Sequence, residues 1–308
     1  MLSRIKSFLV LCLAAFFVSA VYSQNEERPV RVTTDLVTIT LTVTDPYGRY
    51  VSGLKKHAFT IYDEGEEQEI SFFSNADAPV SIGILFDISG SMSGEKIQRA
   101  RKALERFVSI SHPMDEYFLI AFNSRAQLLL DRTRDSDALL RKLTLVRPKD
   151  NTALYDAVYL GVEKVTRGAH QRKAILIISD GQDNSSRYTF KEVKNLLKES
   201  DVTIYAVGIM DSNDMRDVIG LQGQAFLDEL AAVSGGKSFY PKTNVELDEI
   251  FERIAIELRN QYSVGYIPKN FKPDGKWRRI KVKVKPPKGM PRLIVRTREG
   301  YYATPTIK

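Results

Sequence analysis

Short apolar runs alternate with helical patterns through the middle of the chain. Residues 82–86 form a short apolar run, bulky except at Gly83, which is typical of a strand buried on both faces. Residues 97–108 then place apolar side chains three and four positions apart, with charged residues between them, as an amphipathic helix does. Because this alternation continues to residue 260, we expect an α/β fold with a doubly wound, mostly parallel sheet and helices on both faces.

One pair of strands is predicted to break the parallel arrangement. Residues 117–122 and 127–130 both read as strands, and only a short stretch around Asn123 and Ser124 separates them. A crossover to a parallel neighbour needs a dozen residues or more. The short connection therefore predicts a hairpin, with one antiparallel strand at the edge of the sheet.

The remaining elements of this region follow from the same periods. We expect further strands at 175–178, 202–209 and 237–240, and helices at 136–145, 154–165, around 193–197, at 226–233 and at 247–258. Residues 210–224 are predicted to be a loop beside the same edge of the sheet. This loop carries three aspartates that could shape partner selectivity, namely Asp211, Asp214 and Asp217.

Both flanks of this region have the period of β structure. Apolar residues alternate with threonine over residues 37–43, as in a half-buried strand. Further strands are predicted after residue 260, at 262–267, 278–285 and 293–297. Segments 24–79 and 261–308 are each too small to be stable alone. We therefore expect them to pair into one β-sandwich, with the α/β domain of residues 80–260 inserted between them.

Charge is distributed unevenly along the chain. The formal net charge is +7, and residues 261–308 carry 13 basic residues against two acidic ones. Such a tail raises the question of nucleic-acid binding. However, Lys281, Lys283 and Lys285 alternate with valine, which is the pattern of a strand with one solvated face. We therefore expect no nucleic-acid partner.

The first 23 residues have the features of an export signal. Arg4 and Lys6 give a positive start, and residues 8–20 are apolar apart from Ser19. This pattern predicts a secretory signal peptide over residues 1–23, cleaved after Ala20 or Ser23, and a secreted, extracellular or periplasmic protein. The alternative is a retained membrane anchor, for which the apolar run is short.

The single cysteine, Cys12, lies within this leader. Leu11 before it is too large for the usual lipoprotein signal, so we expect no lipidation. The exported protein would then have no disulfide and would depend on core packing alone.

Oxygen-bearing side chains follow the first apolar run of the α/β region. Asp87, Ser89 and Ser91 stand at alternate positions, and Gly90 and Gly94 allow the backbone to curl before the next helix. Open α/β sheets bind ligands at the carboxyl ends of their strands. A carboxylate and two hydroxyls suit a hard cation such as Mg²⁺ better than zinc or copper. The alternative is structural, since Asp and Ser also cap helices and close turns.

Two further stretches favour the metal site. Thr152 offers a hydroxyl at the start of another helix, and Asp180 follows the apolar run at 175–178. Three loops then supply oxygen donors at one edge of the sheet, which predicts a shared ion. Asp183 lies in the oxygen-rich loop after Asp180. Whether it joins the site, binds a second ion or is a solvated loop acid is open.

This set of residues resembles the von Willebrand factor A domain and its metal-ion-dependent adhesion site. The family pattern is Asp-x-Ser-x-Ser, then a Thr from a second loop and an Asp from a third, and all five positions match: Asp87, Ser89, Ser91, Thr152 and Asp180. The resemblance implies a Rossmann-like fold and a non-enzymatic adhesion or assembly module. It also implies bound Mg²⁺ or Mn²⁺ that takes an Asp or Glu carboxylate from a partner protein. The whole chain is also similar to bacterial secreted von Willebrand factor A-related proteins.

A metal-dependent hydrolase or phosphatase that uses Asp87 is the alternative function. The position of Asp87 resembles that of the nucleophile in haloacid dehalogenase-like phosphatases. Those enzymes need a second carboxylate two residues later, where this chain has Ser89. No histidine is close to the site in sequence, and phosphate-binding glycine loops are missing. A separate hypothesis is that the closing helix, residues 244–260, transmits changes at the ion to the basic tail.

Overall fold

The computed structural model describes residues 36–210 and 218–304. The predicted signal peptide, residues 1–23, lies outside these ranges, as do Asp211, Asp214 and Asp217, so the hypotheses about them stay predictions. Within the described ranges, no helix is long and apolar enough to cross a membrane.

A six-stranded sheet forms the centre of the α/β region. Its strand order is β10-β9-β8-β5-β6-β7, and all neighbouring strands are parallel except β6 and β7. The predicted hairpin and antiparallel edge strand are therefore confirmed. The strands are β5 (Val80–Asp87), β6 (Glu116–Phe122), β7 (Ala126–Thr133), β8 (Arg172–Ser179), β9 (Thr203–Gly208) and β10 (Lys237–Phe239).

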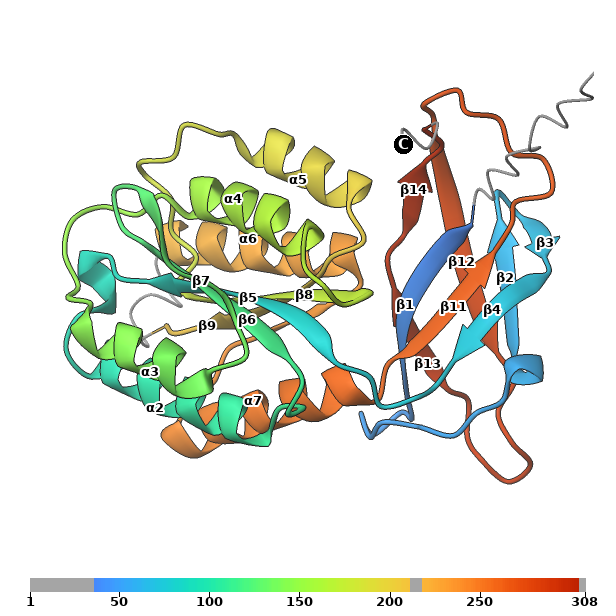
Figure 1. Ribbon diagram of the computed structural model, residues 1–308, viewed down its shortest axis with the longest axis horizontal. Helices are drawn as coiled ribbons and strands as arrows, with labels where there is room; N and C mark the ends of the chain where they lie inside the picture. Colours follow the sequence, from blue (N-terminus) through green and yellow to red (C-terminus); the bar gives the residue numbers. More distant parts are fainter. Residues whose placement is uncertain (1–35, 211–217, 305–308) are drawn as a thin grey trace, which may run out of the picture. The chain divides into compact units, whose positions relative to one another are not determined.

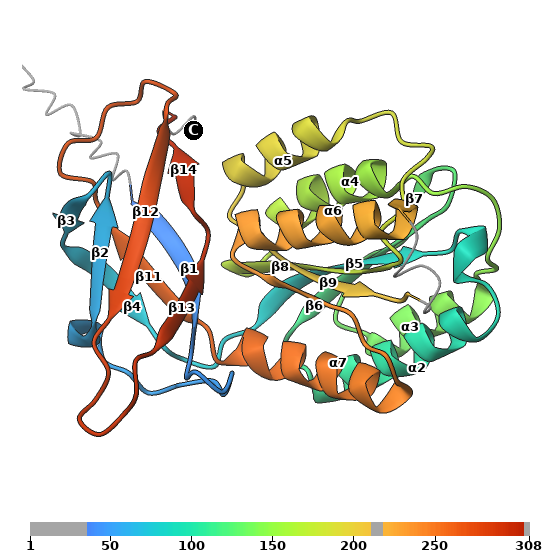
Figure 2. The same cartoon turned by 180° about the vertical axis from the view of Figure 1, so that it is seen from behind.

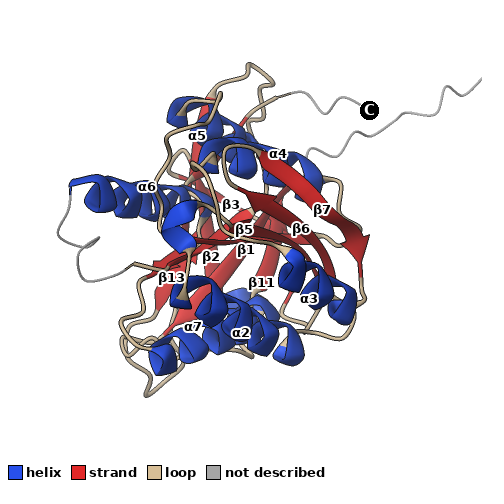
Figure 3. Cartoon of the chain, turned by 90° about the vertical axis from the view of Figure 1, so that its left-hand side faces the viewer, coloured by secondary structure: helices blue, strands red, loops and turns tan. Residues whose placement is uncertain are grey.

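Helices cover both faces of this sheet, as the sequence predicts. Figures 1 and 2 show one layer on each side, and Figure 3 views the same layers with α2, α3 and α7 below the sheet. Strand β5 supplies Ile84 and Phe86 to one core and Leu85 to the other, which explains its lack of polar alternation. The first layer is α2 (Glu95–Ile110), α3 (Ser136–Leu145) and α7 (Asn244–Arg259), and the second is α4 (Leu154–Thr166), α5 (Phe190–Glu199) and α6 (Val218–Ser234).

Helix α6 corrects one expectation. Residues 210–224 were expected to form a loop, but α6 already begins at Val218. The helix carries glycine where it approaches the Asp180 loop, since a Cβ on Gly223 would lie 2.7 Å from the carbonyl carbon of Gly181. Apolar side chains in the first turns of α6 are exposed, including Ile219 and Leu221. The first turns of α6 therefore lack the buried apolar stripe on which the prediction relied.

The two flanks build the predicted β-sandwich. One sheet has the order β13-β1-β11-β4 and the other β14-β12-β2-β3, so strands from both ends of the chain pair in each. The inner faces enclose one core that includes Ile39, Ile61 and Val264. The elements are β1 (Val37–Thr44), the 3₁₀ helix η2 (Lys56–Ala58), β2 (Phe59–Asp63), β3 (Glu66–Gln68), β4 (Ile70–Ser74), β11 (Tyr262–Tyr266), β12 (Trp277–Val284), β13 (Ile294–Thr297) and β14 (Gly300–Tyr302).

The lysines of the basic tail lie on a solvated face, as predicted. Lys281 and Lys283 are exposed, while Val282 and Val284 pack against the sandwich core. Strand β12 pairs with β14 only over residues 277–279 and with β2 over residues 280–284, so Lys281 and Lys283 have a paired strand on one side only.

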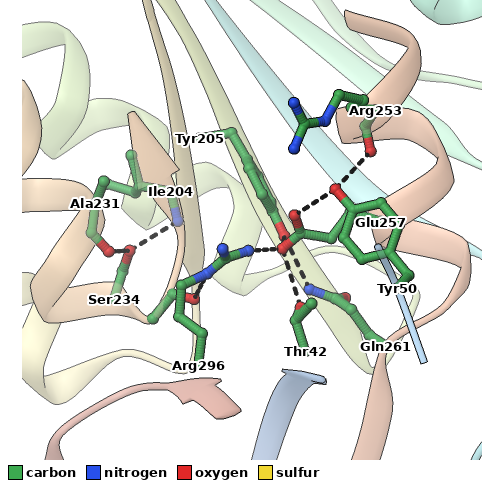
Figure 4. Close-up of polar contacts among 11 residues, drawn as sticks. Thr42, Tyr50, Ile204, Tyr205, Ala231, Ser234, Arg253, Glu257, Gln261 and Arg296 are labelled. Atoms are coloured by element: carbon green, nitrogen blue, oxygen red, sulfur yellow. Dashed lines mark hydrogen bonds and ion pairs between the residues drawn. The ribbon is translucent and has the colours of Figure 1, made fainter. Parts of the chain in front are cut away.

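A buried carboxylate joins α7 to the sandwich and to the central sheet. Glu257 of α7 accepts hydrogen bonds from Thr42 Oγ1 of β1, at 2.9 Å, and from Tyr205 OH of β9, at 2.7 Å. It also accepts from Tyr50 OH, at 2.9 Å, and pairs with Arg296 of β13 (Figure 4). These contacts link the closing helix physically to the basic tail. Transmission of a change from the ion to the tail stays a prediction.

Gly235, which follows α6, provides a test of close packing. Its φ is +76°, and a Cβ there would lie 2.4 Å from the carbonyl carbon of Thr297 and 2.5 Å from the amide nitrogen of Arg298. We expect Gly235→Ala to lower the free energy of unfolding by about 3 kcal/mol, from backbone strain and overpacking together. Urea denaturation measures this loss.

The matched control is Gly275→Ala. Gly275 also has a positive φ, of +68°, but no atom lies within 4 Å of its Cβ position. This variant should show only the backbone term, about 1–2 kcal/mol. Equal losses in the two variants would mean that the approach of Gly235 to β13 has no energetic consequence.

Candidate metal centre

Adjacent parallel strands bring the two predicted acidic ligands to one edge of the sheet. Phe86 of β5 is in register with Ile178 of β8. Asp87 is the last residue of β5, and Asp180 follows the last residue of β8. Both side chains are buried, with 0% and 1% of their surface exposed. The apolar runs that form the strands thus position two carboxylates beside each other.

The loop after β5 turns its two serines toward each other. Ser89 Oγ and Ser91 Oγ are 3.0 Å apart, and Ser89 N donates to Asp87 Oδ1 at 2.8 Å. The 3₁₀ helix η3 (Gly90–Met92) makes this turn. Ser89 is buried, whereas Ser91 is exposed. The three predicted ligands of this loop therefore form one cluster that reaches from the interior to the surface.

Backbone hydrogen bonds hold the Thr152 loop against the first loop. Gly90 N donates to Asp150 O at 3.0 Å, and Lys149 N donates to Ile88 O at 3.0 Å. Thr152 itself is buried. The structure thus brings the second predicted loop to the same edge as Asp87.

The loop after β8 is fixed to Thr152 in turn. Thr152 N donates to Asn184 Oδ1 at 2.8 Å, and Thr152 O accepts from the backbone N–H groups of Asn184 and Ser185 at 3.0 Å each. All three loops predicted to supply ligands are consequently joined by hydrogen bonds. The five predicted residues lie on this joined set of loops.

The electrostatics of the edge are unfavourable without a cation. The pKa of Asp87 is raised to about 7. Burial is the largest cause and the negative charge of Asp180 the second, while the hydrogen bonds that Asp87 accepts lower the pKa. Asp180 Oδ2 is buried and has no hydrogen-bond partner. A buried carboxylate oxygen without a partner is costly, and a divalent cation would satisfy it. The residues present therefore fit the implied ion.

Serine and threonine oxygens are needed to complete such a site. Within residues 36–210 and 218–304, no three His, Cys, Asp or Glu side chains gather closely enough to hold a metal ion. Two carboxylates with neutral hydroxyls form a hard oxygen donor set, which suits Mg²⁺ or Mn²⁺.

Asp183 has a structural role in this arrangement. Its carboxylate accepts from Tyr155 N at 3.0 Å and from Ser186 Oγ at 2.5 Å. Tyr155 lies in the first turn of α4, whose unpaired N–H groups favour a carboxylate. Asp183 thus holds the helix that begins beside Thr152, a use that sequence reasoning did not weigh.

Ser179 is a residue of the site that sequence reasoning missed. Its Oγ donates to Asp87 Oδ2 at 2.6 Å and accepts from Gly181 N at 3.0 Å. It therefore orients the carboxylate of Asp87 from the neighbouring strand. The available signal was a buried polar residue at the end of an apolar strand, next to a predicted ligand.

Histidines lie away from this edge. His170 N donates to Ser81 Oγ, at 3.0 Å, near the start of β5. His112 N donates to Asp115, which also accepts from the first N–H of β5. The length of β5, about 20 Å, separates this end from Asp87. The third histidine of the chain is in η2. The two histidines of the α/β region are thus at the opposite end of the sheet.

Comparisons with known proteins identify the family of the α/β region. The family model described as the von Willebrand factor type A domain matches residues 81–253. An uncharacterized protein of Borreliella burgdorferi is 23% identical over 217 residues, which cover 67% of this chain and 62% of that protein. The uncharacterized protein sll0103 of Synechocystis is 21% identical over 155 residues, which cover 48% of this chain and 37% of that protein. The match thus covers less than two thirds of the length of either relative.

A solved structure shows the same fold. A mutant of the PilB minor pilin from Streptococcus sanguinis superposes with a TM-score of 0.50 at 13% identity, covering 59% of this chain and 62% of the pilin chain. The family model spans more than half of the 308 residues and includes every predicted ligand. The chain therefore belongs to the von Willebrand factor type A domain family.

Proposed function

We propose that residues 80–260 form a divalent-cation-dependent protein-binding module for adhesion or assembly. Mg²⁺ is the proposed ion, with Mn²⁺ as the alternative, and a partner protein supplies an Asp or Glu carboxylate to it. The proposed ligands are Asp87, Ser89, Ser91, Thr152 and Asp180. The observation that carries the proposal is the buried, unpartnered Asp180 Oδ2 beside the buried Asp87.

The charge balance of the site supports an anionic partner. Asp87 and Asp180 contribute at most two negative charges, and the three hydroxyl ligands are neutral. A bound divalent cation would supply an electrophilic position that attracts an additional anionic oxygen. Exposed Ser91 leaves the cluster open to solvent on one side. A carboxylate from another protein can approach from that side.

The domain arrangement and location belong to the same proposal. Residues 24–79 and 261–308 supply the sandwich on either side of the binding module. Residues 1–23 act as a signal peptide that directs the protein to the periplasm or the extracellular space. The membrane would be contacted only through this segment if it were retained.

The hydrolase alternative has less support from the site. Ser89 stands where a second carboxylate would act as acid and base, and His112 and His170 lie at the far end of β5. General acid–base catalysis at Asp87 therefore lacks the second proton-transfer group that a carboxylate at position 89 or a nearby histidine would supply. Turnover of phosphate or carboxylate esters that requires Mg²⁺ and Asp87 would favour the alternative.

The direct test titrates Mg²⁺ and Mn²⁺ calorimetrically into protein treated with EDTA. We expect one cation per chain. The immobilised protein is then exposed to native extracellular or envelope material. Captured protein should be released by EDTA and also by a glutamate-containing peptide that competes for the ion. Absence of cation binding, or capture unaffected by both EDTA and the peptide, would contradict the proposal.

Ser179→Ala should weaken cation binding without removing a proposed ligand. The Ser179 hydroxyl holds Asp87 Oδ2 at 2.6 Å, and loss of such an orienting partner typically lowers metal affinity by about 10–100-fold. Calorimetry measures the change. The matched control is Ser109→Ala, because Ser109 lies near the other end of α2 and donates only to Arg106 O. Unchanged affinity in Ser179→Ala would place the ion away from Asp87.

A further inference from the structure

A groove with basic walls begins directly beside the proposed metal loop. It has a volume of about 960 Å³ and lies between α2 and α3. Its lining starts at Ser93 and Gly94, immediately after η3, and continues along α2. The groove is therefore continuous with the surface on which a partner would reach the ion.

Four cationic side chains line this groove: Arg101, Lys102, Arg141 and Arg147. Arg101 Nη2 donates to Val146 O at 2.7 Å, which holds this guanidinium between the two helices. Lys102 makes no ion pair within the described ranges. Arg141 reaches only the exposed Asp135, at 3.4 Å. The four cations outnumber the two acidic residues of the lining, Glu105 and Asp137, so the groove carries a net positive charge.

The cations are also close to one another. Burial, and then the positive charge of Arg147, lower the pKa of Arg101. Arg101 Nε is buried and has no hydrogen-bond partner. Like charges held together in a groove create a positive potential, which attracts an anionic ligand.

The acidic residues of the groove lie at its far end. Glu105 is one turn beyond Arg101 on α2, and Asp137 is in the first turn of α3. Helix α2 starts at the metal loop, and the chain after α3 returns to that loop, where Asp150 O accepts from Gly90 N. The cations therefore lie between the proposed ion and these two acids.

We propose that this groove binds an acidic segment of the same partner protein whose carboxylate reaches the ion. This inference rests on the proposed function and specifies its partner. Arg101 lies seven residues after Gly94, the residue that precedes α2, which corresponds to about 10 Å along the helix axis. An extended peptide covers that distance in about three residues. The partner should therefore carry a second acidic residue about three positions from the metal-bound one.

Binding of the full chain to densely immobilised synthetic peptides tests this inference. Three Gly/Ser peptides are compared: one with a single glutamate, one with a second glutamate three residues away, and one with lysine at that place. In Mg²⁺ we expect the two-glutamate peptide to bind at least 10-fold more tightly than the single-glutamate peptide, and the lysine peptide to bind most weakly. EDTA should release all three.

Variants separate the groove from general charge attraction. Lys102→Gln/Arg147→Gln should reduce binding of the two-glutamate peptide to the single-glutamate level, with Mg²⁺ affinity unchanged. If the double variant melts at a lower temperature than the wild type, Lys102→Glu alone provides the test. It should also reduce binding of the two-glutamate peptide. The control Arg279→Gln/Lys281→Gln removes the same charge from β12 and should leave the preference intact.

The outcomes distinguish the two proposals. Peptide binding that persists in EDTA would contradict the metal-dependent function itself. Equal Mg²⁺-dependent binding of the one- and two-glutamate peptides would overturn the groove inference alone. A loss of preference in the β12 control as large as in the groove variants would also overturn it.

Discussion

Replacing Asp87 by alanine is expected to abolish both Mg²⁺ binding at physiological concentration and Mg²⁺-dependent partner capture. Asp87 is one of only two proposed charged ligands, and its carboxylate is fully buried. The loss of a charged oxygen ligand should weaken the ion by at least 100-fold, or about 3 kcal/mol. Calorimetric titration and capture on immobilised protein measure the two effects. Partner capture that survives in Asp87→Ala would exclude the ion bridge.

Substitution of Asp87 should change the stability of the protein in opposite directions with and without the ion. Without a cation, Asp87 and Asp180 are buried carboxylates whose repulsion contributes to the raised pKa of Asp87. Asp87→Asn removes one of these charges and keeps an oxygen that can accept from Ser89 N, so it should be at least as stable as the wild type in EDTA. Added Mg²⁺ should raise the melting temperature of the wild type only. An equal rise in Asp87→Asn would indicate a cation site elsewhere.

The fold was predictable because its signals are local and repeated. Residues 82–86 and 175–178 are apolar without interruption since both faces of β5 and β8 are covered by helices. The hairpin after β6 followed from the length of its connection alone. The start of α6 was not predictable in this way, because Gly223 meets Gly181 where an apolar side chain would normally mark the helix. A close approach of two backbones leaves no hydrophobic period in the sequence.

The candidate site was predictable only in its residue types and their order. Asp87 and Asp180 could be assigned to one edge because parallel strands end there together. The role of Asp183 was left open, since its partners Tyr155 and Ser186 are set by how α4 packs on the loop. Ser179 was missed because its contact with Asp87 crosses between strands, 92 residues apart in the chain. Such contacts depend on register, which composition and spacing do not encode.

Glu257→Ala is expected to cause one of the two largest losses of stability outside the site, comparable to that of Gly235→Ala. Glu257 is 1% exposed and pairs with Arg296, while it accepts hydrogen bonds from Tyr205 and Thr42 (Figure 4). Removing one partner of a buried ion pair typically costs about 3–5 kcal/mol, because the other charge is left uncompensated. The side chain of Arg296 is 27% exposed, so its charge is only partly removed from water. We therefore expect a loss near the lower end, about 3 kcal/mol.

Two further variants on α7 serve as comparisons for the loss of stability expected in Glu257→Ala. Glu252→Ala removes an exposed carboxylate that pairs with Arg106 at 3.3 Å, and it should cost no more than about 1 kcal/mol. Glu257→Gln keeps the shape and one acceptor oxygen, so it should lie between the two alanine variants. Urea denaturation compares all three. Similar losses for Glu257→Ala and Glu252→Ala would show that the junction contributes little.

The double variant Glu257→Ala/Arg296→Met identifies the origin of the effect. If the loss comes from an uncompensated charge on Arg296, removing that charge should recover part of the stability lost in Glu257→Ala. If it comes instead from the hydroxyl groups of Tyr205 and Thr42, which lose their acceptor, the double variant should be no more stable than Glu257→Ala. The first result is expected, because the ion pair joins α7 to β13 and so connects the end of the α/β region to a strand of the tail.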